Sequence, residues 1–103
     1  MRRMSAILPA LATASLLVGN VAAHAYTGQE LAGKARIGIE QARRIALKAH
    51  PGTITDEELE RERGGSGLRY SFDIKRGSLT QEVGVDARSG KVLENRKEGP
   101  NPD

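Results

Sequence analysis

Cysteine and tryptophan are absent from the 103-residue chain, and its aromatic side chains are limited to two tyrosines and one phenylalanine. Without cysteine, the protein has no disulfide, no thiolate metal site and no cysteine nucleophile. Small exported domains often use disulfides to supplement a thin hydrophobic core, so this chain must rely on aliphatic packing instead. A chain of this length supports one domain of marginal stability.

Charged residues are absent from residues 5–22, which follow a short start containing two arginines. The tripeptide Ala23-His24-Ala25 comes next. A basic start, an apolar segment and an A-x-A site are the marks of a secretory signal peptide. We therefore predict a signal peptide over residues 1–25 that is cleaved after Ala25, so that the mature chain begins at Tyr26.

The alternative to cleavage is a membrane anchor that is never cut. A spanning helix needs about 20 predominantly apolar residues, whereas this segment contains Pro9, Gly19 and Asn20. We therefore expect the membrane to matter only during export, and the mature protein to be periplasmic or secreted. Cleavage removes two arginines and leaves 14 basic against 13 acidic residues, so the net charge falls from +3 to +1. We do not expect such a chain to bind nucleic acid.

Residues 38–49 have the pattern of a short amphipathic helix. Its apolar side chains share one arc, namely Ile39, Ala42, Ile45, Ala46 and Ala49. Gly38 is an acceptable N-cap, and Pro51 disfavours helical backbone at His50. Because the inward face is mostly alanine, the helix needs larger side chains from another element.

Alternation with a period of two predicts two strands downstream. Residues 68–76 are the clearest, with Leu68, Tyr70, Phe72 and Ile74 on one face. Residues 79–87 repeat the pattern, with Leu79, Val83, Val85 and Ala87 on one face. Residues 86–91 predict a hairpin turn in which Gly90 takes the left-handed conformation, and a short last strand follows over residues 91–95.

Residues 53–63 predict an acidic first strand. Ile54 and Leu59 have opposite parity, so we expect either a β-bulge between them or a later start of the strand. Its charge density is typical of an edge strand. The predicted fold is α+β, with one helix packed on one face of a three- to four-stranded antiparallel β-meander. Alanine should let this helix lie close over Tyr70, Phe72 and Val83.

Three segments complete the predicted organisation. Residues 26–36 are polar and form a flexible lead-in, in which Leu31 is the one residue expected to dock on the domain. Residues 37–95 form the domain itself. Residues 96–103 hold two prolines and mixed charge, and we expect them to be a disordered tail.

Three runs together resemble a PepSY domain, namely IEQARRIALKAHPG at 39–52, LRYSFDIK at 68–75 and EVGVDARSGKVLE at 82–94. The most specific part is the V-D-A-x-x-G-x-V hairpin over 85–92, combined with the upstream A-x-x-I-A-L helix. The resemblance implies a helix on an antiparallel sheet. PepSY domains occur in propeptides of secreted thermolysin-type metallopeptidases, in envelope proteins and as small exported proteins. The resemblance therefore implies binding or restraint of a peptidase, or sensing within the envelope.

Catalysis is not expected, since the resemblance supplies no catalytic residues. His50 is the only histidine of the mature chain and should be an exposed or capping residue at the helix end. The serines at 66, 78 and 89 lie in predicted turns with no activating context. The acidic run 56–62 is interleaved with arginine rather than spaced as a calcium loop. We expect it to pair with Arg69, Lys75 and Arg76, and we predict no metal and no cofactor.

Three apolar residues fit the predicted core poorly. Leu47 lies off the apolar arc of the helix, and either Val92 or Leu93 must face away from the core. They are candidate partner contacts, although single exposed apolar residues are also normal. If the chain ends at Asp103, no catalytic domain follows, so a peptidase partner would be bound in trans.

The sequence thus favours an exported, non-enzymatic binding module whose partner is a secreted or envelope peptidase or another envelope protein. The edge strand at 91–95 is its expected contact. The alternative is a structural or sensory envelope protein that binds a small ligand or peptide on the polar sheet face around Arg69, Asp73 and Glu82.

Overall fold

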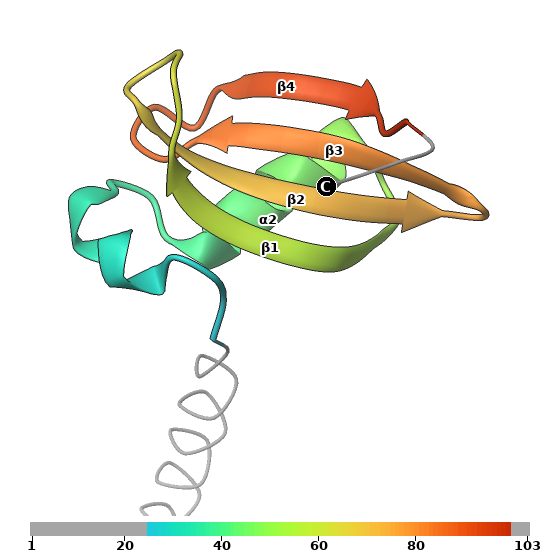
Figure 1. Ribbon diagram of the computed structural model, residues 1–103, viewed down its shortest axis with the longest axis horizontal. Helices are drawn as coiled ribbons and strands as arrows, with labels where there is room; N and C mark the ends of the chain where they lie inside the picture. The colour runs from blue at the N-terminus through green and yellow to red at the C-terminus, as the bar shows by residue number, and fades with distance from the viewer. Residues whose placement is uncertain (1–24, 100–103) are drawn as a thin grey trace, which may run out of the picture.

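The computed structural model describes residues 25–99, so most of the predicted signal peptide, Ala23 included, lies outside the described residues. The described elements are the 3₁₀ helix η1 (Gln29–Lys34), the helix α2 (Ile39–Ala49) and the strands β1 (Thr53–Arg61), β2 (Leu68–Arg76), β3 (Leu79–Asp86) and β4 (Val92–Lys97). The strands form one antiparallel sheet in the order β1-β2-β3-β4. The helix α2 lies across one face of this sheet (Figure 1). The predicted α+β fold is confirmed, with four strands.

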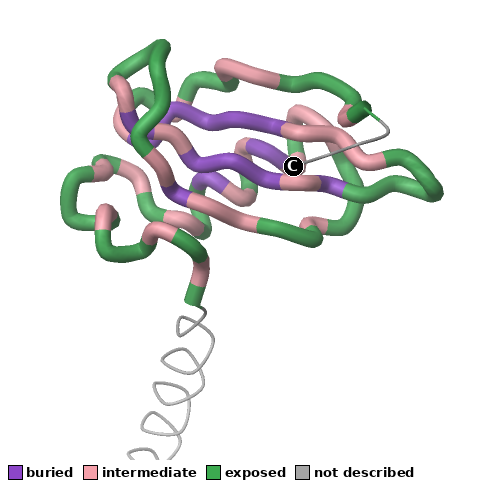
Figure 2. Tube along the Cα trace, viewed as in Figure 1, coloured by how far each residue is buried: buried purple, intermediate pink, exposed green. Residues whose placement is uncertain are grey.

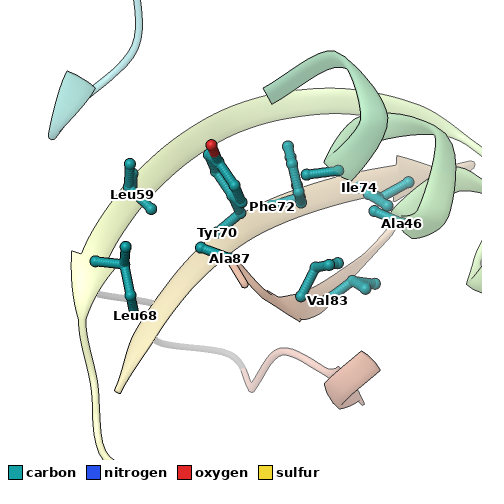
Figure 3. Close-up of a cluster of buried hydrophobic side chains, with 10 residues drawn as sticks. Ala46, Leu59, Leu68, Tyr70, Phe72, Ile74, Val83 and Ala87 are labelled. Atoms are coloured by element: carbon teal, nitrogen blue, oxygen red, sulfur yellow. The ribbon is translucent and has the colours of Figure 1, made fainter. Parts of the chain in front are cut away.

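The core lies between α2 and the sheet, and the purple segments of Figure 2 mark it. All four apolar residues predicted for the inner face of β2 are fully or almost fully buried, as are Val83, Val85 and Ala87. Figure 3 shows Phe72 and Ile74 beside the helix, while Leu59 and Leu68 lie further from it along the sheet. Ala42 and Ala46 have no exposed surface, because their small side chains let α2 approach β2 and β3 closely. Burying each large side chain stabilises the fold by roughly 1.5–3 kcal/mol.

One residue predicted for the inner face is not buried. Leu79 is 56% exposed, although its alternation matches that of Val83 and Val85. The reason is that the β2–β3 hairpin extends past the end of α2 (Figure 1), where Leu79 pairs with Arg76. The period of a strand assigns a face, but it does not show how far the covering helix reaches.

The strand β1 is the predicted acidic edge strand, and it ends at Arg61 rather than Arg63. Its pairing with β2 shifts between Ile54 and Asp56, which confirms the expected bulge. Beyond the shift, Glu57 stands opposite the buried Phe72. The bulge therefore turns an acidic side chain toward the helix side of the sheet.

The last strand runs two residues further than predicted, because β4 includes Arg96 and Lys97. The Glu98 N–H then donates to the Thr80 carbonyl at 2.9 Å. Residues 96–98, assigned to the tail from the sequence, thus pair with β3. Residues 100–103 lie outside the described residues. Gly90 has φ 78°, which confirms its left-handed conformation in the β3–β4 turn.

Residues 26–36 contain regular structure that their polarity did not predict. Thr27 forms a parallel bridge with Glu58, and its carbonyl accepts from the Leu59 N–H at 2.8 Å. Leu31 in η1 packs against the core as expected, and Tyr26 does so as well. Within the described residues, the helices, the four strands and the buried core all lie between Tyr26 and Gly99.

Candidate functional site

The sheet has two edge strands, and they differ in what covers them. The middle of β1 is covered by the chain itself, through the hydrogen bond between Leu59 and Thr27. The start of β1 borders an open cleft of about 480 Å³ that also touches Ala25 and Tyr26. The outer side of β4 pairs with no strand of the described residues. No backbone hydrogen bond within the described residues covers this side of β4.

Backbone geometry shows which groups β4 presents at this edge. The Lys91 carbonyl accepts from the Asp86 N–H at 2.8 Å and so points toward β3. Because a trans peptide places its C=O and N–H on opposite sides, the Val92 N–H points away from β3. The Glu98 N–H points inward to Thr80, and the alternation along a strand then turns the N–H and C=O of Asn95 and Lys97 outward. The outer edge of β4 therefore offers donors and acceptors to another strand.

The three predicted partner residues occupy different environments. Val92 is 41% exposed and stands opposite the buried Val85. Leu93 is half-buried, because a register shift beside it interrupts the pairing of β4 with β3. Leu47 is half-buried and packs against the core. Of the three, Val92 alone is exposed.

An ion pair missed from the sequence joins α2 to β1. Arg43 donates bidentately to Glu57, through Nε to Oε2 and through Nη2 to Oε1 at 2.9 Å. The two side chains are only 23% and 17% exposed. The hydrogen bond with Glu57 raises the pKa of Arg43. Only the bulge in β1 brings Glu57 to the helix side, and the bulge was the sequence signal that could have found this pair.

Arg69 lies flat across the polar face of the sheet. Its Nη2 donates to the Arg63 carbonyl at 2.8 Å, and its Nη1 lies 3.4 Å from Glu94 Oε1. A Cβ atom at Gly84 would approach Arg69 Cδ to 2.9 Å, so glycine makes room for the arginine. The predicted pairing of Arg69 with acids of β1 is wrong, since Arg69 reaches β4 instead. Among the described residues, Lys75 and Arg76 form no ion pair with β1 either.

The polar face carries a row of acids across three strands. Asp56 stands opposite Asp73, which stands opposite Glu82. Burial raises the pKa of Asp73, and nearby Glu98 and Asp56 raise it further. Burial also raises the pKa of Glu82, with Glu94 adding to the effect. Within residues 25–99, no three acidic or histidine side chains are placed to hold a metal ion.

Asp86 holds together two turns at one end of the sheet. Its side chain is 1% exposed. Oδ1 accepts from the Ser66 N–H at 2.7 Å and from Ser66 Oγ at 2.9 Å. Oδ2 accepts from the Ser89 N–H at 2.8 Å and from the Arg88 N–H at 3.2 Å. Burial alone would raise the pKa of Asp86, but these hydrogen bonds outweigh burial and hold the pKa well below its ordinary value. The sequence identified Asp86 only as a turn residue.

No catalytic arrangement surrounds His50. Its N–H caps α2 by donating to the Ala46 carbonyl at 2.9 Å, as predicted for a residue at the helix end. In the described part of the chain, no serine hydroxyl is hydrogen-bonded to His50. No helix within residues 25–99 is long and apolar enough to cross a membrane.

Comparison with known proteins identifies the domain. Residues 36–96 match the family model PepSY, described as the peptidase propeptide and YPEB domain. A search of curated proteins and a search of solved structures each found no match. The matched region holds α2, all four strands except the last residue of β4, and the whole buried core. The chain therefore belongs to the PepSY family.

Proposed function

We propose that this protein is an exported, non-enzymatic binding module that engages a peptidase of the cell envelope through the outer edge of β4. Membership of the PepSY family supports the peptidase as partner, because the family comprises peptidase propeptide-like or inhibitor-like modules. The A-x-A pattern at Ala23 and Ala25 supports cleavage before Tyr26 and a periplasmic or secreted mature chain.

The observation that carries the proposal is the uncovered backbone of β4. A partner strand laid along this edge would receive main-chain hydrogen bonds without any special side-chain motif. Each such bond contributes about 0.5–1.5 kcal/mol. Val92 would add apolar contact, while Glu94 and Arg96 give the edge charges of both signs. Mixed charge discourages unselective strand pairing and favours a partner with complementary charge.

Replacing Val92 with proline tests this edge. Proline removes the N–H that points away from β3, so the β3–β4 pairing should persist while a partner strand loses a donor. We expect binding of a captured envelope peptidase to weaken at least about tenfold, measured by co-purification of tagged residues 26–103 from periplasmic extract and then by titration.

Val92→Ala is the matched control, since it keeps the N–H and shortens only the side chain. It should bind more tightly than Val92→Pro. Equal binding by both variants and the original protein would contradict use of this edge. A scrambled-sequence control that recovers the same proteins would remove the evidence for a specific partner.

The second candidate is a structural or sensory envelope protein with a ligand on the polar sheet face. The observation in its favour is the acidic row, because a cationic ligand would relieve repulsion between Asp73 and its neighbours. Arg69 is less available to such a ligand, since Glu94 and the Arg63 carbonyl already hold it. Chemical-shift mapping with cationic envelope fragments tests it, and an unchanged spectrum would exclude this candidate.

A further inference from the structure

Three segments that are distant in sequence meet at the end of the sheet where β1 leads into β2. They are residues 34–36, the β1–β2 loop at 62–67 and the β3–β4 turn at 87–91, which lie together in Figure 1. Arg88 joins all three, because its Nε donates to the Lys34 carbonyl at 3.0 Å and its Nη1 to the Ser66 carbonyl at 3.1 Å. The Arg36 N–H also donates to the Ala87 carbonyl at 2.9 Å. These bonds fix the backbone of the three segments relative to one another.

A cleft of about 370 Å³ opens between these segments. Its polar lining consists of Arg36, Ser66, Asp86, Arg88, Ser89 and Lys91. The side chain of Leu93 closes the apolar side, within 2.7 Å of where a Cβ at Gly65 would lie. A glycine at 65 therefore leaves room for both Leu93 and Asp86 at the base of the cleft.

The charges around this cleft are unbalanced. Three cations line it, and its single acid, Asp86, is buried and already accepts four hydrogen bonds. Among residues 25–99, no acidic side chain forms an ion pair with Arg36, Arg88 or Lys91. Arg36 and Lys91 are exposed. The cleft thus has a surplus of positive charge that the protein itself does not neutralise.

We propose that this cleft binds a phosphate group. Arginine matches phosphate oxygens through its planar fork, and lysine binds phosphate as a mobile point charge. Arg88 is pre-organised, because backbone carbonyls hold its Nε and Nη1 while its Nη2 has no hydrogen bond within the described residues. Three cations suit a phosphate group, whose anionic oxygens accept several charge-assisted hydrogen bonds whether the group carries one negative charge or two. The cleft is larger than a bare phosphate and so has room for a further group on the ligand.

Two classes of molecule carry such a phosphate group, namely soluble phosphorylated molecules and anionic phospholipids with a phosphate in the headgroup. Neither source of phosphate requires a bound peptidase, because most of the cleft is formed by loops, with Asp86 from the end of β3 and Leu93 from β4 completing it. The cleft can therefore be tested without a peptidase.

The first test titrates inorganic phosphate into ¹⁵N-labelled residues 26–103 at pH 7, with chloride replaced to hold ionic strength constant. We expect saturable amide shifts confined to Ser66, Ser89 and their neighbours in the cleft. The double variant Arg36→Gln/Lys91→Gln should bind at least about tenfold more weakly, because it removes two exposed cations without disturbing the bonds of Arg88.

The matched control is Lys75→Gln/Arg76→Gln, which removes two exposed cations from the other end of β2. It should bind phosphate as tightly as the original protein. Unsaturable or scattered shifts, or equal weakening in both double variants, would overturn the site. Vesicles of phosphatidylglycerol and of phosphatidylcholine then separate the two sources. A lipid headgroup is supported if the protein binds phosphatidylglycerol vesicles but not phosphatidylcholine vesicles, and if Arg36→Gln/Lys91→Gln weakens that binding. Phosphate binding without vesicle binding supports a soluble ligand.

Discussion

Replacing Asp86 with asparagine should lower the free energy of unfolding by about 2–4 kcal/mol. The carboxylate accepts four hydrogen bonds while fully buried, from groups on the β1–β2 loop and the β3–β4 turn. An asparagine amide has only one acceptor oxygen, so its NH₂ group would face the donors of Ser66 or of Ser89 and Arg88. Leaving a buried N–H unpaired costs about 1–3 kcal/mol. Urea denaturation followed by circular dichroism measures the loss.

The matched control is the same substitution at Asp73. This carboxyl stands between Asp56 and Glu82 on the polar face, and burial with neighbouring acids raises its pKa. Removing its charge should therefore leave stability unchanged or slightly increased. If Asp86→Asn destabilised the protein no more than Asp73→Asn, the account of Asp86 as the link between the two turns would be wrong.

The pH dependence of stability should have a maximum near pH 4–5. The pKa values of Glu58, Asp73 and Glu82 are raised, chiefly by burial. The native state takes up these protons at higher pH than the unfolded chain, so stability rises as pH falls from 7 toward the ordinary values near 4. The pKa of Asp86 is lowered, so its contribution is lost as pH falls below about 4. In Asp86→Asn, stability should still rise as pH falls from 7, but the loss of stability below about pH 4 should be smaller. Urea titrations from pH 2 to 7 measure both effects.

Replacing Gly28 with alanine should cost about 2–3 kcal/mol and release the N-terminal segment from the sheet. Gly28 has φ 84°, a left-handed conformation that alanine adopts only with strain. A Cβ there would lie 1.8 Å from the Leu59 carbonyl oxygen, which belongs to the backbone of β1. The segment must therefore move away, losing the hydrogen bond between Leu59 and Thr27 and the packing of Tyr26 on Tyr70.

Hydrogen exchange distinguishes this local release from general unfolding. The Leu59 amide should lose protection in Gly28→Ala, while the amides of β2 and β3 keep theirs. Gly33→Ala is the control, because no atom lies within 4 Å of its added Cβ. Unchanged Leu59 protection in the Gly28 variant would show that the segment does not depend on glycine at this position.

The sequence predicted the sheet and helix because their signals are local. The period of β2 assigned four residues to the core, and all four are buried. Alanines at 42 and 46 predicted a close helix, and Gly90 predicted the turn. The prediction that Leu79 lies on the buried face was wrong, because the length of sheet that α2 covers depends on how distant elements pack together.

The polar contacts were mostly missed because they join residues far apart in sequence. The partner of Arg69 is Glu94 on β4 rather than an acid of β1, and only the register of three strands determines that choice. Arg43 pairs with Glu57 because a bulge in β1 turns Glu57 toward the helix. The effect of that bulge on side-chain direction cannot be assigned without knowing how β1 pairs with β2. Asp86 looked like an ordinary turn residue because the loop that donates to it lies about 20 residues earlier. The N-terminal segment has no hydrophobic period, and contacts with residues far along the chain, such as that of Thr27 with β1 and that of Lys34 with Arg88, order it.

The most direct test of the proposed function is a titration of residues 26–103 against a secreted thermolysin-type peptidase, following both substrate cleavage and survival of the domain. The proposal predicts saturable inhibition with the domain intact and weaker inhibition by Val92→Pro than by Val92→Ala. Absence of inhibition, or rapid digestion of the domain while cleavage continues, would contradict a role as a peptidase-binding module.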